Sequence, residues 1–373
     1  MSRLLRLVAV ALPLTLLASC AEEEPDTRTQ APETSEASTP ETTTSSHSPT
    51  GSGQPKVVDT VASGLAVPWG IDFLPDGSAL VTERDSHRLL RIADGEVEQV
   101  GTLDESAPNG EGGSLGIAVS PTYEDDGWIF VYVTTAEDNR IIRYSYGEDG
   151  LSDEQVILDA IPNGFIHDGG RIEFGPDGLL YVATGEAGEP ELAQDRDSLG
   201  GKILRITTDG DPASGNPDED SPVWTLGHRN IQGLAFDEDD RLWASEFGAS
   251  DWDELNLIEA GDNYGWPLVE GKGGNGDYTE PRAVWPTSDA SPSGLAYLDG
   301  SLWMAGLRGE RLWRIPVTSD GAGEPKSFFM GDYGRLRTVV VAPDGNLWVT
   351  TSNKDGRGDP ADQDDRILVV DPG

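Results

Sequence analysis

RIEFGPDGLLYVATGE, residues 171–186, consists of two apolar stretches separated by the turn sequence Pro-Asp-Gly. Asp-Gly and Pro-Asp-Gly favour tight turns between strands, and the flanking Ile, Leu, Val and Tyr favour half-buried positions in a sheet. The stretch therefore predicts a β-hairpin. Related patterns occur at five other places, GIDFLPDGSALVTE (70–83), GIAVSPTYEDDGWIFVYVT (116–134), GLAFDEDDRLWASEFG (233–248), GLAYLDGSLWMAG (294–306) and VVVAPDGNLWVTTS (339–352).

A second short apolar stretch with charged flanks follows each of these six units. These stretches are HRLLRIADG (87–95), NRIIRYSYG (139–147), GKILRITTDG (201–210), ELNLIEAG (254–261), ERLWRIPV (310–317) and DRILVVDPG (365–373). Six such repeats predict an all-β fold, a six-bladed β-propeller of four-stranded blades. A straight β-solenoid is the competing architecture, but its repeats are shorter and it needs capping ends.

The last repeat stops after only three strands. KVVDTVAS, residues 56–63, is rich in β-formers and precedes the first repeat. We therefore expect this N-terminal strand to form the outer strand of the last blade and so to close the ring.

The first 55 residues are expected to lie outside the propeller. Arg3 and Arg6 precede an apolar run that ends in Leu-Ala-Ser-Cys at 17–20. This is the pattern of a secretory signal, and the run is too short for a membrane span, which needs roughly 20 apolar residues. LASC resembles a bacterial lipobox, which predicts a lipoprotein signal peptide over 1–19. Cys20, the single cysteine of the chain, would then carry the lipid.

Such a lipid would anchor the protein to the extracytoplasmic side of the cell membrane without a spanning segment. The alternative is an ordinary secreted protein with an incidental cysteine. The rest of 20–55 is rich in Thr, Ser, Pro and Glu, which predicts a disordered acidic linker. Residues 56–373 are left as the propeller domain.

The charge balance excludes one class of partner. Asp and Glu number 67 against 26 Lys and Arg, a formal charge of −41. Nucleic-acid binding needs clustered basic residues, so no nucleic-acid partner is expected. Nicotinamide use is also disfavoured, because no G-x-G-x-x-G follows a strand and opens a helix.

One of the four histidines stands out by its setting. His167 lies in Phe-Ile-His-Asp-Gly-Gly-Arg, residues 165–171, immediately before the inner strand of the third repeat. A histidine at that place points into the mouth of the central channel. An imidazole that titrates near neutral pH suits the abstraction of a proton.

Beyond single residues, longer motifs carry a family resemblance over nearly all of 60–370. They are GLAVPWGIDFLPDG (64–77), GEGGSLGIAVSP (110–121), HDGGRIEFGPDGLLYVATGE (167–186), LGGKILRI (199–206), LGHRNIQGLAF (226–236), DELNLIEAGDNYGWP (253–267) and GRLRTVVVAPDG (334–345). The chain resembles the soluble pyrroloquinoline quinone (PQQ) dependent sugar dehydrogenases, the glucose/sorbosone dehydrogenase family. The aldose sugar dehydrogenase branch is the most similar.

The resemblance implies a role for several residues. His167 matches the base that takes the hydroxyl proton while hydride passes to calcium-bound PQQ. Arg229 and Asn230 match residues that contact the cofactor. Arg335 and Arg337 match an Arg-x-Arg pair on the cofactor carboxylates, and Arg308 stands where the family often has lysine. A guanidinium suits this cofactor because it binds carboxylates with a planar pair of donors.

The resemblance also implies calcium. The family loop that binds it through main-chain carbonyls usually reads Gly-Pro, and here it reads Gly248-Ala249. Glu254 and Tyr264 match positions that hold a further calcium ion in the aldose dehydrogenase branch. Calcium prefers oxygen ligands in a flexible shell, and as a Lewis acid it polarises a bound carbonyl.

Other positions depart from the family pattern. Glu111 occupies a cofactor-contacting position that is often Gln, and a carboxylate beside an anionic quinone needs a metal or an arginine to balance it. Ile166 replaces an Asp that glucose-specific relatives carry before the histidine, which favours a broader range of sugars. Tyr278 is a further possible contact to the cofactor.

These features predict an extracytoplasmic oxidoreductase that oxidises the anomeric hydroxyl of aldose sugars to lactones and passes electrons to an external acceptor. A calcium-dependent lactonase propeller is a second hypothesis, against which Arg335 and Arg337 argue. A non-catalytic extracellular binding propeller is a third, for which Glu111 and Ala249 would be early signs of a lost site.

Overall fold

The computed structural model describes residues 53–274 and 276–373. The predicted signal peptide, Cys20 and nearly all of the linker lie outside the described residues. Within the described residues no helix is both long and apolar enough to cross a membrane. The regular structure there consists of 25 strands, the four-residue helix α1 (Tyr123–Asp126) and the single 3-10 turn η1 (Pro190–Ala193).

The strands form six antiparallel sheets, which are the blades, numbered here in chain order. From the innermost strand outward, blade 1 is β2 (Pro68–Phe73), β3 (Ala79–Glu83), β4 (Arg88–Ala93) and β5 (Glu96–Thr102). Blade 2 is β6 (Ser114–Val119), β7 (Trp128–Thr134), β8 (Asn139–Gly147) and β9 (Gly150–Ile161). Blade 3 is β10 (Ile172–Phe174), β11 (Leu180–Ala183), β12 (Lys202–Ile206) and β13 (Val223–Leu226).

The remaining three blades follow the same order. Blade 4 is β14 (Ile231–Phe236), β15 (Leu242–Glu246), β16 (Trp252–Ile258) and β17 (Ala283–Pro286). Blade 5 is β18 (Pro292–Leu298), β19 (Ser301–Gly306) and β20 (Arg311–Thr318), with β21 (Gly321–Ala322) and β22 (Lys326–Phe328) both paired to β20. Blade 6 is β23 (Leu336–Val341), β24 (Leu347–Thr351), β25 (Ile367–Asp371) and β1 (Lys56–Ala62).

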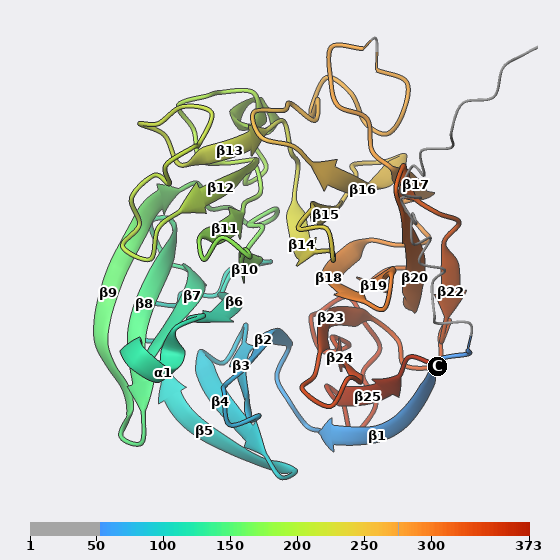
Figure 1. Ribbon diagram of the computed structural model, residues 1–373. Coiled ribbons are helices and arrows are strands. Elements are labelled where there is room, and N and C mark those ends of the chain that lie inside the picture. Colours follow the sequence, from blue (N-terminus) through green and yellow to red (C-terminus); the bar gives the residue numbers. More distant parts are fainter. Residues whose placement is uncertain (1–52, 275) are drawn as a thin grey trace, which may run out of the picture. The chain divides into compact units, whose positions relative to one another are not determined.

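The blades stand in a ring around a central channel (Figure 1). The innermost strands contact one another in chain order from β2 to β23, and β23 contacts β2 in turn. The prediction of an all-β, six-bladed propeller is confirmed. β1 pairs with β25 from Lys56 opposite Asp371 to Ala62 opposite Ile367, which is the pairing expected for residues 56–63. That this strand holds the ring closed stays a prediction.

The core forms because the side chains of a strand point alternately to the two faces of its blade. In β7, Ile129, Val131 and Val133 pack into a buried cluster shared with blade 1. Phe130 and Tyr132, which alternate with them, pack into the cluster shared with blade 3. Successive side chains of a strand point to opposite faces, so a blade that is covered on both sides needs apolar residues at every position. This explains why WIFVYVT reads as one continuous apolar run.

The Pro-Asp-Gly turns join the first and second strands of a blade. At residues 75–77, Gly77 has φ of 83°, and Asp76 accepts a hydrogen bond from the main chain of Ser78 at 2.9 Å. Each innermost strand runs from one mouth of the channel to the other, and the turn that follows it lies at the second mouth. The loops between blades, and those between second and third strands, therefore share one mouth.

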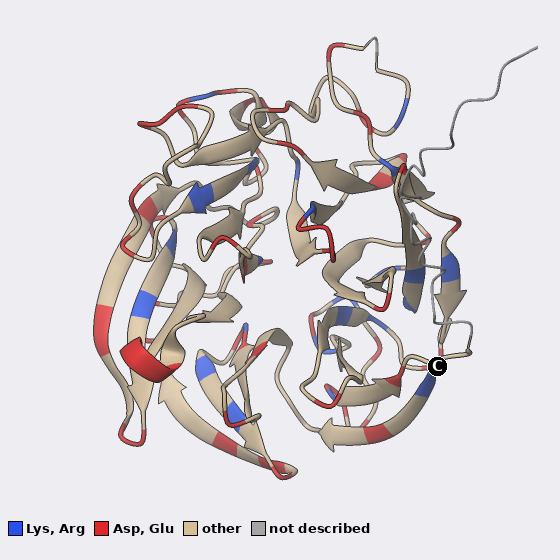
Figure 2. Cartoon of the chain, viewed as in Figure 1, with Lys and Arg blue, Asp and Glu red and all other residues tan. Residues whose placement is uncertain are grey.

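Acidic residues are spread over the outer strands β1, β5 and β9, over α1 and over the rim loops (Figure 2). The negative charge thus belongs to the outside of the propeller as well as to the N-terminal linker. The inside of one mouth has the opposite character, because arginines line the cavity there.

Candidate active site

One cavity of about 400 Å³ lies at the mouth where the inter-blade loops meet. Loops from all six blades line it. It brings together nine residues that the sequence singled out, His167, Glu111, Arg229, Asn230, Arg308, Arg335, Arg337, Gly248 and Ala249. Two of the predicted residues, Glu254 and Tyr264, line a different and much smaller cavity.

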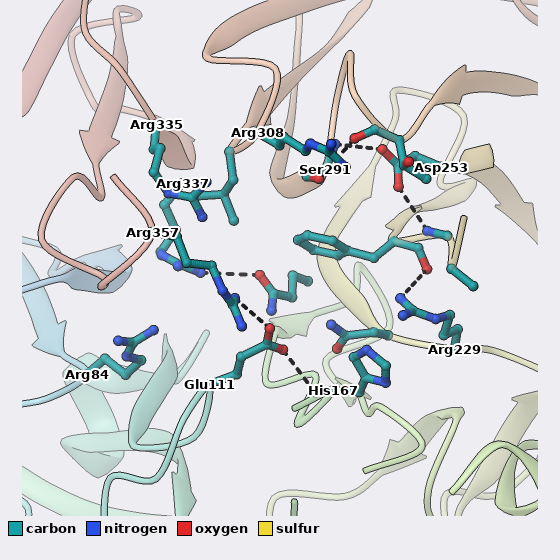
Figure 3. Close-up of a pocket in the computed structure, with 17 residues that line it drawn as sticks. Arg84, Glu111, His167, Arg229, Asp253, Ser291, Arg308, Arg335, Arg337 and Arg357 are labelled. Atoms are coloured by element: carbon teal, nitrogen blue, oxygen red, sulfur yellow. Dashed lines mark hydrogen bonds and ion pairs between the residues drawn. The ribbon is translucent and has the colours of Figure 1, made fainter. Parts of the chain in front are cut away.

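The large cavity is basic. Six guanidinium groups line it, those of Arg84, Arg229, Arg308, Arg335, Arg337 and Arg357, against the two carboxylates of Glu111 and Asp253. Figure 3 shows Arg335, Arg337 and Arg357 on one side and Arg229 on the other, with Glu111 and His167 between them. In a chain of formal charge −41, so many arginines at one place indicate an anionic ligand.

His167 lies on the loop between β9 and β10, and its ring is held from one side. Nδ1 is 2.9 Å from Oε1 and 3.0 Å from Oε2 of Glu186, whose side chain is almost fully buried. A carboxylate there stabilises the tautomer with a proton on Nδ1, which leaves Nε2 free to accept one. His167 itself has φ of 62°, and a β-carbon on Gly185 would lie 1.9 Å from the His167 carbonyl oxygen. Glycine at 185 therefore lets the loop approach β11 closely.

Glu111 supports the same loop through its carboxylate. Oε2 accepts a hydrogen bond from the main-chain N–H of His167 at 2.9 Å, and Oε1 lies 2.7 Å from Nη1 of Arg357. Burial alone would raise the pKa of Glu111, but the His167 N–H and the positive charge of Arg357 outweigh it, so the pKa is lowered. Of the two kinds of partner expected for this carboxylate, a metal or an arginine, the structure places an arginine, Arg357, beside it.

The arginines on the other side are tied together by one acid. Asp355 Oδ2 accepts hydrogen bonds from Arg335 at 2.8 Å and from Arg337 at 3.2 Å. Burial would raise the pKa of Asp355, but the two guanidinium charges dominate and lower it. Arg337 also donates to Ser352 Oγ at 2.9 Å. The pair is therefore fixed before any ligand binds.

Arg229 and Asn230 follow β13 and face the cavity from blades 3 and 4. Arg229 donates to the carbonyl oxygen of Phe247 at 3.3 Å, and its buried Nε has no partner among the described residues. Burial lowers the pKa of Arg229, against the opposing effect of the nearby carboxylates, of which Glu186 is the strongest. The side chain of Asn230 accepts the N–H of Gly169 at 3.0 Å and so supports the His167 loop.

The Gly248–Ala249 loop is wrapped around a carboxylate. Glu270 Oε1 accepts the main-chain N–H groups of four consecutive residues, Ala249 at 2.8 Å and Ser250, Asp251 and Trp252 at 3.0 Å each. In a trans peptide the N–H and C=O groups point in opposite directions. The carbonyl groups of Gly248 and Ala249 therefore point away from Glu270. Asp253 accepts the Gly248 N–H at 2.9 Å, and burial raises the pKa of Asp253 to about 6.

The smaller cavity, of about 10 Å³, has room for about one water molecule or ion. Its walls include Glu246, Glu254 and Glu270. Burial, together with the charge of Glu246, raises the pKa of Glu254 to about 8. Tyr264 stacks on His228, with ring centroids 4.6 Å apart, and His228 bonds Glu246 at 2.8 Å.

No three His, Cys, Asp or Glu side chains within 53–274 and 276–373 are arranged to hold a metal ion on their own. A calcium ion at either place would therefore depend on main-chain carbonyl oxygens as well. Tyr278 lines neither of the two cavities and packs beside Gly265.

Sequence reasoning missed Glu186, Asp355, Arg84 and Arg357. Glu186 carried a usable signal, because LVTE, ATGE and WASE place Glu83, Glu186 and Glu246 at or just after the end of the second strand in three repeats. All three are buried, and an acid repeated at a buried position needs a partner. The other three residues lie in loops whose lengths differ between repeats, so the loop residues of one repeat cannot be aligned with those of another.

Known proteins resemble this chain over most of its length. A family model described as glucose/sorbosone dehydrogenase matches residues 65–361. The PQQ-bound aldose sugar dehydrogenase of Streptomyces coelicolor is 53% identical, with a TM-score of 0.85 over 87% of this chain and 99% of that one. A Thermus thermophilus structure named as an oxidoreductase (glucose dehydrogenase) is 42% identical, with a TM-score of 0.80 over 85% and 100% of the chains. The aldose sugar dehydrogenase of Escherichia coli K12 is 28% identical over 80% of this chain and 91% of its own.

Proposed function

This chain belongs to the glucose/sorbosone dehydrogenase family, and we propose that it is a PQQ-dependent dehydrogenase that oxidises the anomeric hydroxyl of aldose sugars to lactones. The observation that carries the proposal is the convergence of six arginines and a carboxylate-supported histidine on one cavity. The relatives named above are sugar dehydrogenases, and one of them binds PQQ.

The cavity fits a tricarboxylated planar molecule. Arg335 and Arg337 are preorganised by Asp355, and Arg229 has a buried donor without a partner in the described chain. These three guanidinium groups are the proposed cofactor ligands, with Arg308 and Asn230 beside them. When bound, PQQ supplies the two-electron acceptor for the hydride that leaves the anomeric carbon.

His167 is the proposed base. Its Nε2 takes the proton of the anomeric hydroxyl while the C–H electron pair leaves, so that the C–O bond becomes the lactone carbonyl. Glu186 holds Nδ1 at 2.9 Å and stabilises the imidazolium that results. An external acceptor would have to take up the two electrons in the end, and His167 would release the proton to solvent.

Calcium is proposed at the Gly248–Ala249 loop. The clamp by Glu270 turns two carbonyl groups away from that carboxylate, and both residues line the cavity. Carbonyl oxygens are ordinary calcium ligands, and the bound ion would polarise a ligand carbonyl. Glu254, with the main chain of Tyr264, is the proposed holder of a second ion.

The experiment is turnover by the full-length protein. PQQ and Ca²⁺ are added to the purified apoprotein, and dye reduction is followed with several aldoses. We expect sugar-dependent reduction that is lost in His167→Gln and retained in the matched control His87→Gln, with PQQ binding unchanged in both. Binding of PQQ without turnover of any aldose would favour a binding propeller, and lactone hydrolysis without PQQ would favour a lactonase.

We also propose that the protein is a lipoprotein anchored on the extracytoplasmic face of the cell membrane, because LASC at 17–20 ends an apolar signal-like run. Cys20→Ser is expected to move the protein from the membrane fraction to the soluble fraction. Mass spectrometry of the mature N-terminus should find acyl groups on Cys20, and an unmodified Cys20 in membrane-bound protein would contradict the proposal.

A further inference from the structure

Arg357 connects loops that are far apart in the sequence. Its Nη1 lies 2.7 Å from Oε1 of Glu111, and the second oxygen of that carboxylate accepts the main-chain N–H of His167 at 2.9 Å. Arg357 lies between β24 and β25 in blade 6, Glu111 before β6 in blade 2, and His167 before β10 in blade 3. One arginine therefore reaches the main chain of the proposed base through one carboxylate (Figure 3).

The His167 loop needs this support because its main chain is left-handed. A φ of 62° costs a residue with a β-carbon about 1 kcal/mol or more, so neighbouring groups must hold it. Glu111 accepts a hydrogen bond from the main-chain N–H of His167, and Asn230 accepts one from the N–H of Gly169. Glu186 bonds the imidazole of His167. Glu111 is also paired with an arginine, whereas the partner of Glu186 is the imidazole of His167 itself.

The charges around the base explain why that cation is needed. Glu111, Glu186 and the buried Asp168 bring three acidic groups to this corner of the cavity, and Arg84, Arg229 and Arg337 are further basic groups whose charges act there. A carboxylate repelled by its neighbours would turn out towards solvent unless a partner held it. The main-chain N–H of Arg357 donates to Asp355, the acid that also holds Arg335 and Arg337.

We propose that Arg357 is a positioning residue for the sugar oxidation: it holds Glu111 ionised and in place against His167, so that the imidazole keeps its direction into the cavity. The role of His167 rests on the proposed function, whereas the link from Arg357 through Glu111 does not. A glutamine at position 111 would need no such partner, so the arginine and the glutamate form one unit in this chain.

The test compares Arg357→Gln, Arg357→Lys, Glu111→Gln and the double variant R357Q/E111Q. Arg91→Gln is the matched control, because Arg91 forms a 2.8 Å ion pair with Asp76 on blade 1 outside this cavity. The first readout is the pH dependence of kcat with PQQ bound. The second is the pH titration of the His167 imidazole in the protein without PQQ, followed by NMR of ¹⁵N-histidine and assigned by its absence in His167→Gln.

We expect R357Q to move both midpoints upward by about half a pH unit, because the loss of a positive charge favours the protonated imidazole. E111Q is expected to move them downward, the double variant to lie near the wild type, and R357K to behave like the wild type. We also expect kcat of R357Q to fall about tenfold, which is typical for the loss of a group that orients another.

Shifts in the same direction, or no shift, in R357Q and E111Q overturn the proposal, since a merely structural pair has no reason to act with opposite signs. Failure of R357K to restore the midpoint overturns it as well. If the wild-type protein oxidises no aldose, the proposed function fails, and the NMR titration without PQQ still decides whether Arg357 acts on His167.

Discussion

The imidazole of His167 faces both carboxylate oxygens of Glu186, with Nδ1 at 2.9 and 3.0 Å from them. Glu186 follows β11, whereas His167 precedes β10, and the close approach at Gly185 brings these two loops together. The pair gives the proposed base one tautomer and one direction without any contribution from a ligand.

Glu186→Gln is therefore expected to lower kcat by about 100-fold, because an amide stabilises neither the required tautomer nor the imidazolium. PQQ affinity, measured by fluorescence quenching, should change little, since the proposed cofactor ligands lie elsewhere in the cavity. Unchanged kcat in this variant would remove Glu186 from the mechanism.

Asp168 should make stability depend on pH. Burial raises its pKa to about 7, and its Oδ2 has no partner in the described structure. The native state thus keeps a proton that the unfolded chain has already released, so stability falls as pH rises from about 4 through 7. Relative to the wild type, Asp168→Asn should gain about 2 kcal/mol in free energy of unfolding between pH 5 and pH 8.

Urea unfolding at the two pH values measures this gain for Asp168. Asp104→Asn, at an exposed position, is the control and should show the same difference from the wild type at both pH values. An equal effect of D168N at pH 5 and pH 8 would contradict a raised pKa for Asp168.

Gly248→Ala tests the proposed calcium loop. The added β-carbon would lie 1.9 Å from the carbonyl oxygen of Trp252, so the loop has to shift. We expect at least about a tenfold loss of Ca²⁺ affinity by calorimetry, in line with the effect of disturbing groups that orient metal ligands. Gly147→Ala, where a β-carbon meets no atom within 4 Å, should bind Ca²⁺ like the wild type. Equal affinities in all three proteins would place calcium elsewhere.

Removal of β1 tests whether this strand closes the ring. A protein that starts at residue 64 leaves β25 as an unpaired edge, and its thermal midpoint should fall by about 10 °C or more. A protein that starts at residue 53 keeps the strand and should match the full chain. Equal midpoints for the two truncations would show that the ring does not depend on β1.

The sequence alone was sufficient to predict the fold, because each repeat contains both a turn signal and apolar β-forming stretches on either side of it. WIFVYVT and the Pro-Asp-Gly turns are explained by local rules, and six copies leave little choice of architecture. The pairing of residues 56–63 followed from a count of strands in the last repeat. Arg335, Arg337 and Arg229 were predicted because the motifs GRLRTVVVAPDG and LGHRNIQGLAF resemble those of the family, and the resemblance implies a role for each arginine.

The contacts between distant loops could not be predicted from the sequence, although Glu111 itself was. Arg357 and Glu111 are paired between loops of different blades, and Asp355 serves two arginines from a loop of no recognisable pattern. The ring brings these loops to the same mouth, but no repeat pattern shows which residues of the loops then face one another. Which of their residues contact one another is known only from the three-dimensional structure.

The two ends of the described propeller meet in blade 6: a β-carbon added to Gly53 would lie 2.5 Å from the carbonyl carbon of Gly373. The chain could therefore begin at another blade while the order of the blades around the ring stays the same. A short link between these two glycines, with a new opening at the turn 75–77 beside the far mouth, would give a circular permutant that retains every loop around the cavity. Blade 1 would then be the one assembled from both ends of the polypeptide.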